Sequence, residues 1–149
     1  MAVNGGLAAD QAKIQTKVKD IQSAVRSLEA EVGRLKRLVE STDTSKDQAK
    51  RRAQSFNNLE QIGIAMHSHV QQLQELAAQT GKSEAWSSII NGYAAEFYAG
   101  NRLEFENAVK ALSAKAGTGD REALTKLSSA LKGLKEAAQE LRRQAAALS

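Results

Sequence analysis

The sequence predicts an all-α protein built as a bundle of long helices. About half of the 149 residues are Ala, Glu, Lys, Leu or Arg, a composition typical of long helices and coiled coils. Proline and cysteine are absent and only 4% of the residues are aromatic. This composition disfavours β-sandwiches, disulfide scaffolds and thiolate metal sites. Two heptad repeats, one near each end of the chain, support the same prediction and flank a central region that holds the aromatic residues.

The first heptad repeat lies in residues 1–42. Its apolar residues follow one another at alternating steps of four and three, and we call this line the N-terminal seam: Ile14, Val18, Ile21, Val25, Leu28, Val32, Leu35 and Val39. So strict a repeat makes a narrow stripe that only another long helix covers. We therefore expect a coiled-coil helix whose partner lies in the same chain or in another. The number and orientation of the strands stay open.

The central region, residues 43–119, is predicted to hold helices at about 46–79, 84–99 and 102–116. Ser45 and Gln48 have the spacing of a capping box, so we expect a turn near 41–45. One uninterrupted helix through this segment is the alternative. The first central helix carries a broad apolar stripe: Phe56, Leu59, Ile62, Met66, Val70, Leu73 and Ala77.

The second central helix carries an apolar face at helical spacing, formed by Trp86, Ile89, Ile90, Tyr93 and Phe97. Gly100 and Asn101 are expected to end this helix and to begin the next one. All the aromatic residues lie between positions 56 and 105. Because a buried aromatic side chain removes about 150–250 Å² from water, we predict a small aromatic core in this region.

The C-terminal region, residues 120–149, repeats the pattern of the first. The residues of its heptad line, the C-terminal seam, are Leu124, Leu127, Leu131, Leu134, Ala138, Leu141, Ala145 and Leu148. A bulky seam facing an alanine-containing one is a favourable pairing. Two arrangements are therefore expected as alternatives: the terminal helices pack on each other, or each associates with its counterpart in another chain.

The positive charge of the chain is small and spread along the sequence. The formal net charge is +4, with an excess of two positive charges in each of the segments 1–40 and 120–149 and none between them. The densest basic run is Lys50, Arg51 and Arg52, our candidate phosphate contacts. Nucleic-acid-binding proteins usually gather their basic residues on one face, so solvated helix surface is the favoured interpretation.

No motif in the sequence predicts a catalytic, cofactor or metal site. The chain lacks the glycine-rich phosphate loops, the HExxH motif and the Glu-x-x-His pattern of di-iron bundles. His67 and His69 are two residues apart, so they cannot bind one metal ion from the same helix. His69 lies close to the apolar stripe and is expected to be a hydrogen-bonded interior or interface histidine. We expect no enzyme activity and no cofactor.

These patterns favour a non-enzymatic structural or assembly protein that oligomerises or docks through its heptad helices, such as a virion, tail or secretion-machine component. The expected partners are copies of the same chain or other helical subunits. One alternative is an exported, self-assembling filament subunit. Another is a nucleic-acid-associated protein that uses basic clusters: Lys50, Arg51, Arg52, Arg34, Lys36, Arg37, Arg142 and Arg143. No secretion signal or membrane span is expected, so the predicted location is the cytoplasm or a particle.

Overall fold

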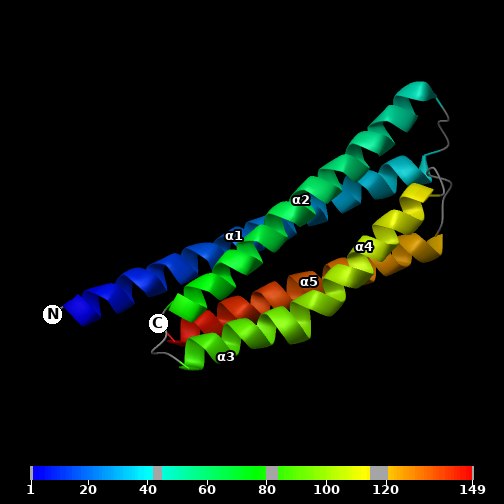
Figure 1. Ribbon diagram of the computed structural model, residues 1–149. Coiled ribbons are helices and arrows are strands. Elements are labelled where there is room, and N and C mark those ends of the chain that lie inside the picture. Colours follow the sequence, from blue (N-terminus) through cyan, green and yellow to red (C-terminus); the bar gives the residue numbers. More distant parts are fainter. Residues whose placement is uncertain (1, 42–44, 80–83, 115–120, 149) are drawn as a thin grey trace.

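The computed structural model describes residues 2–41, 45–79, 84–114 and 121–148, with side chains from residue 12 onward except those of 79, 84, 85 and 148. Every element in these ranges is helical (Figure 1), which confirms the all-α prediction. The elements are α1 (Ala2–Glu40), α2 (Lys46–Gln79), α3 (Glu84–Gly92), the π-helical segment η1 (Tyr93–Tyr98), α4 (Ala99–Ala114) and α5 (Arg121–Leu148).

The helices form an elongated bundle of rods that alternate in direction. Because α3, η1 and α4 follow one another without interruption, they make a single rod that lies beside α5. The α1 helix packs along α2 on one side and along α5 on the other, whereas α2 and α4 touch over only a short stretch. The last turns of α1 and α4 and the first turns of α2 and α5 therefore lie at the same end of the bundle (Figure 1).

The boundary between α1 and α2 follows the predicted cap. The backbone N–H of Gln48 donates a hydrogen bond to Ser45 Oγ (3.2 Å), and the N–H of Ala49 donates to the Ser45 carbonyl oxygen (3.1 Å). The first bond satisfies one of the amide groups that a helix start leaves without a partner, and the second is the first regular bond of the helix. Since Ser41 and Ser45 are not helical, the alternative of one uninterrupted helix is wrong; residues 42–44 lie outside the described part.

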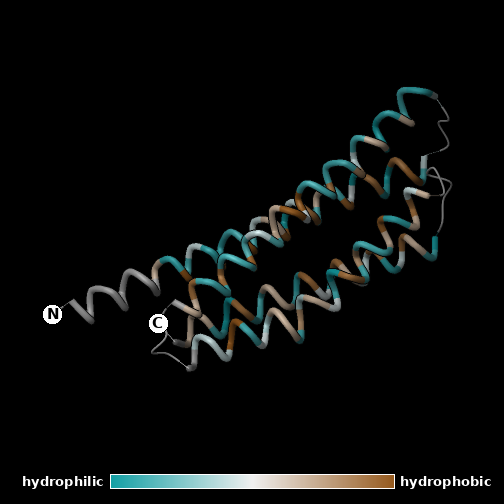
Figure 2. Tube along the Cα trace, viewed as in Figure 1, coloured by the Kyte–Doolittle hydropathy of each residue, from teal (hydrophilic) through white to brown (hydrophobic). Residues whose placement is uncertain are grey.

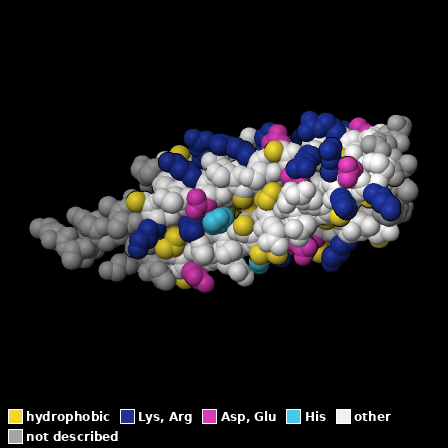
Figure 3. All heavy atoms as spheres, turned by 90° about the horizontal axis from the view of Figure 1, so that it is seen from above, with side chains coloured by type: hydrophobic (Ala, Val, Ile, Leu, Met, Phe, Trp, Pro, Cys, Tyr) yellow, Lys and Arg dark blue, Asp and Glu magenta, His cyan; other side chains and the backbone are white. Residues whose placement is uncertain are grey.

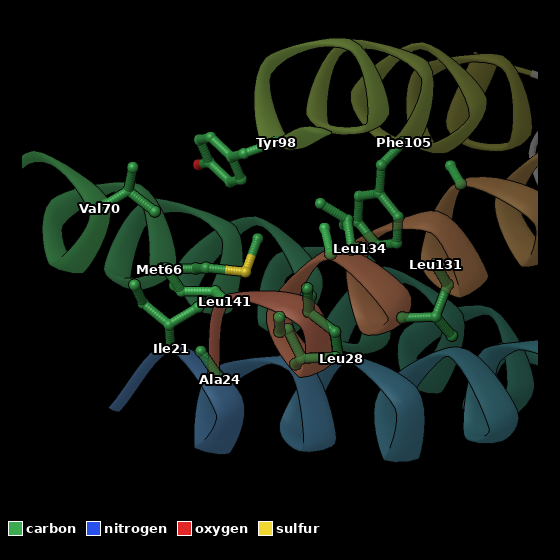
Figure 4. Close-up of a cluster of buried hydrophobic side chains, with 14 of the residues drawn as sticks. Ile21, Ala24, Leu28, Met66, Val70, Tyr98, Phe105, Leu131, Leu134 and Leu141 are labelled. Carbon is green, nitrogen blue, oxygen red and sulfur yellow. The ribbon is translucent and has the colours of Figure 1, made fainter. Parts of the chain in front are cut away.

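The two heptad seams meet inside the chain. Every side chain of the N-terminal seam is at most 5% exposed, and the C-terminal seam is buried from Leu124 to Ala145; Leu148 lies outside the described side chains. Figure 4 shows Ile21 and Leu28 of α1 in one cluster with Leu134 and Leu141 of α5. Of the two expected arrangements, this structure has the terminal helices packed on each other. Association between chains through the seams remains a prediction.

The aromatic residues belong to the same interior as the seams. Tyr98 of η1 and Phe105 of α4 point toward Met66 of α2 and the leucines of α5 (Figure 4). Along all four rods the hydrophobic residues face inward and the hydrophilic ones outward (Figure 2). The core is therefore continuous from α1 to α5, and the central region does not form a separate aromatic core.

The rod from α3 to α4 differs from the expected pair of helices in two respects. First, Gly100 and Asn101 lie inside a helix that continues to Ala114, and Asn101 Nδ2 donates a hydrogen bond to the Phe97 carbonyl oxygen (2.6 Å). Second, Phe97, which we predicted in the core, is 46% exposed, and Tyr98 is buried in its place. The cause is the π-helical turn, whose wider spacing puts residues five apart on one face.

Candidate docking groove

An open groove separates α2 from α4, where the bundle is least tightly closed. Its volume is about 930 Å³. The lining residues on α2 run from Ala49 to Gln71, a distance of about 33 Å along the helix axis. The opposite wall belongs to α4: Arg102, Phe105, Glu106, Val109, Lys110 and Ser113.

The middle of the groove is apolar and accessible. Ile64 is 58% exposed although it lies among other apolar lining residues. Phe56 and Val109 are half-buried and face the groove from α2 and α4. Large exposed apolar side chains that line a shared hollow are typical of binding surfaces, whereas single ones elsewhere need no explanation. The α2/α4 groove is therefore the best candidate for a functional site in the described part of the chain.

Charged side chains border this apolar strip. Arg102 and Glu106 of α4 form an ion pair at 3.0 Å. Arg52, Glu60 and Lys110 line the groove without an ion pair to any described residue. Two of these charges, Arg52 and Lys110, lie toward the end of the bundle where α2 begins and α4 ends, so that end of the groove is basic.

Comparisons with protein-family models, curated proteins and solved structures find no match. The groove must therefore be interpreted from its own chemistry.

His67 lines the groove from α2 and pairs with Tyr98 of η1. The Tyr98 hydroxyl lies 3.1 Å from His67 Nδ1, and the two rings stack with their centroids 6.0 Å apart. Tyr93 stacks on the far side of Tyr98 at 5.9 Å. Burial lowers the pKa of His67, and the Arg102 guanidinium lowers it further. The lowered pKa favours the neutral imidazole of His67 at neutral pH, and its Nδ1 shares a hydrogen bond with the Tyr98 hydroxyl.

Burial also raises the pKa of Tyr98 to about 12, and it raises that of Tyr93 further. A phenol with a raised pKa holds its proton at neutral pH, so the Tyr98 hydroxyl is able to donate a hydrogen bond. The pair fixes the position of η1 against α2. His69, expected to be a hydrogen-bonded interior or interface histidine, lies partly exposed between α1 and α2, with Nδ1 3.4 Å from Lys17 Nζ.

The candidate phosphate contacts do not form one cluster around the groove. Lys50 and Arg51 are exposed on the first turns of α2, whereas Arg52 turns into the groove wall. Ile64, Val109 and Arg102 line the groove but were not predicted from the sequence as site residues. The only available signal was Ile64, an apolar residue that lies off the stripe of Ile62 and Met66.

Within the described ranges, no group of three or more His, Asp or Glu side chains is placed to hold a metal ion. None of the described helices is both long enough and apolar enough to cross a lipid bilayer.

Proposed function

We propose that this protein is a non-enzymatic assembly protein that binds an amphipathic helix of another protein in the α2/α4 groove. The observation that carries the proposal is the apolar groove itself, with Ile64 exposed in its lining. Binding of a helix in an apolar groove between two helices is a common mode of peptide recognition. The contact is placed in the groove and not in the seams, because the seam side chains are already covered within the chain.

The shape of the groove favours a helix of a different chain over a second copy of the same groove. Two concave surfaces placed face to face leave the space between them unfilled, and such voids lose the packing contacts that stabilise an interface. Elsewhere in the described chain, the large exposed apolar side chains are Phe97 and Leu103. These residues are six apart, so they do not make the continuous stripe that would fill the groove.

The charges at the groove border add a requirement for the partner. Since Arg52 and Lys110, at one end of the groove, form no ion pair with any described residue, a helix with acidic residues at its matching end gains charge-assisted contacts there. The expected partner is thus a helix with leucine-like residues three and four apart and with aspartate or glutamate near one end.

A synthetic helical peptide provides the test. The probe is a fluorescein-labelled peptide of about 18 residues, about 27 Å long as a helix, with leucines on one face and two glutamates in the first turn. Fluorescence anisotropy is expected to show saturable binding to the wild-type protein. Ile64→Glu should abolish the binding. Leu103→Glu, a matched control because Leu103 is equally exposed but outside the groove, should leave it unchanged.

A second variant distinguishes a blocked groove from an unfolded protein as the cause of lost peptide binding. No atom lies within 4 Å of the position that a Cβ would take on Gly63, which lines the groove. Gly63→Leu is therefore expected to fold normally, as judged by circular dichroism, and to prevent peptide binding by filling the groove. A peptide of the same composition with its leucines scattered around the helix should not bind. Equal loss of binding in the Ile64 and Leu103 variants, or equal binding of both peptides, contradicts the proposal.

A further inference from the structure

The fold gathers basic residues that are dispersed in the sequence. The last turns of α1 and α4 and the first turns of α2 and α5 all lie at one end of the bundle. We call this surface the basic end, and its positively charged residues are Arg34, Lys36, Arg37, Lys46, Lys50, Arg51, Arg52, Lys110, Arg121 and Lys126. The acidic residues of the same segments are Glu40, Asp47 and Glu122. The excess of positive charge at this end is thus larger than the net charge of the whole chain, +4.

Two hollows show that the four helix ends are neighbours. Lys36 and Glu40 of α1 line one of them together with Arg121 of α5. Arg52 of α2 and Lys110 of α4 line the open end of the α2/α4 groove. On the face drawn in Figure 3, Lys and Arg side chains lie along the whole length of the molecule, and those toward the right-hand end have acidic side chains among them.

Most of this charge is not neutralised within the molecule. Among the described residues, only Lys126 of the basic end forms an ion pair, with Glu122 at 3.3 Å. The neighbouring basic side chains repel one another, and a polyanion that binds them removes that repulsion and releases its own counterions. The third basic cluster considered from the sequence, Arg142 and Arg143, lies at the opposite end of α5, where Glu140 binds Arg143.

The residues around these charges indicate which polyanion fits. Segments 34–40, 46–52, 107–114 and 121–127 contain no aromatic residue, so this end offers no platform on which the bases of a single strand could stack. The large exposed apolar side chains of the described chain, Ile64, Phe97 and Leu103, all lie outside these segments. The basic end therefore lacks the apolar anchor of a membrane-surface helix. Arg and Lys side chains spread over four helix ends suit a repeating array of phosphates.

From these observations we propose that the basic end binds the phosphate backbone of duplex nucleic acid without sequence preference. This inference does not rest on the proposed function, because Arg37, Lys50 and Arg51 lie outside the α2/α4 groove. With about four phosphates contacted, the logarithm of the affinity falls with the logarithm of the salt concentration with a slope of about −3.6. The affinity then decreases about 100-fold between about 50 and 200 mM salt.

The test is fluorescence anisotropy with a labelled DNA duplex of about 24 base pairs and mixed sequence, long enough to present phosphates to the whole end. The first variant combines Arg37→Gln, Lys50→Gln and Arg51→Gln. The matched control combines Lys13→Gln, Lys19→Gln and Arg142→Gln, which removes the same charge from exposed positions elsewhere. Because all six side chains are exposed, both variants are expected to fold like the wild type.

The basic-end variant is expected to bind at least about 10-fold more weakly than the wild type and to have a salt slope smaller by about 2.7. The control should bind within about 3-fold of the wild type, since its phosphate contacts are intact. The proposal is overturned if the wild type does not bind the duplex at about 50 mM salt, or if both variants weaken binding equally. Tighter binding to polyglutamate or to phosphatidylserine vesicles than to the duplex also overturns it, in favour of an acidic protein or a membrane.

Discussion

At the scale of single residues, the pair of His67 and Tyr98 makes the stability of the protein depend on pH. Burial and Arg102 lower the pKa of His67 from its ordinary value of 6.5. The unfolded chain therefore binds a proton at a higher pH than the folded protein does, and stability falls as the pH falls through this window. Well above pH 6.5 the histidine is neutral in both states, so the stabilising effect of the neutral form is fully present there.

We predict that His67→Gln weakens this pH dependence. Glutamine keeps an acceptor for the Tyr98 hydroxyl but does not titrate. Between pH 7 and pH 5, the free energy of unfolding measured with urea should fall more for the wild type than for the variant. Proton NMR of the histidine rings should give a midpoint for His67 below 6.5, with His69→Gln used to assign the resonances. A midpoint at or above 6.5 would show that the ring is not held in its neutral form.

At the scale of the elements, the helix content could be predicted from the sequence. Which face of the rod from α3 to α4 is buried could not. The apolar spacing of Trp86, Ile90, Tyr93 and Phe97 fits an α-helix, so periodicity alone places Phe97 inside. The π-helical turn between Tyr93 and Tyr98 changes that phase and exposes Phe97. Packing decides this turn, because it buries two stacked tyrosines against α2 and α5. The spacing of apolar residues in the sequence does not reveal this turn, because tertiary packing selects it.

The close approach of α4 to α5 leads to a prediction at this scale. A Cβ on Gly133 would lie 2.6 Å from Asn101 Cγ and 2.9 Å from its Nδ2. Gly133→Ala gains about 1 kcal/mol of helix propensity. The displaced Asn101 side chain, however, loses its hydrogen bond to the Phe97 carbonyl, which is worth about 1 kcal/mol. We therefore expect almost no net change in the free energy of unfolding.

Removing the Asn101 side chain should reveal the gain in helix propensity. In an Asn101→Ala background, Gly133→Ala is expected to stabilise the protein by about 1 kcal/mol, measured as a double-mutant cycle in urea. Gly33→Ala is the matched control, because nothing lies within 4 Å of the position of its Cβ. It should stabilise both backgrounds equally. If Gly133→Ala has the same effect with and without Asn101, the two helices do not approach as closely as described.

At the scale of the whole molecule, the sequence predicted two seams of apolar residues but not whether they pair within one chain or between chains. The heptad spacing of Val18 to Val39 requires a partner helix, and it is satisfied equally by a helix of the same chain or of another. In the structure α5 and α2 provide that cover. The groove and the basic end were not predictable for a related reason, since both join side chains from helices distant in sequence. Arg52 and Lys110 share a hollow only because α2 and α4 run in opposite directions.

The within-chain pairing of the seams makes a last prediction. If one chain buries its own seams, the urea midpoint of unfolding is independent of protein concentration. If the seams pair between chains, a 100-fold increase in concentration adds about 2.7 kcal/mol to the apparent stability.

Leu134→Ala, at a seam position that is 1% exposed, should lower the free energy of unfolding by about 2–5 kcal/mol at every concentration. Leu103→Ala, at a 59% exposed position, should cost less than about 0.5 kcal/mol. A midpoint that rises with concentration, together with a lower mass for Leu134→Ala in light scattering, would instead place the seams between chains.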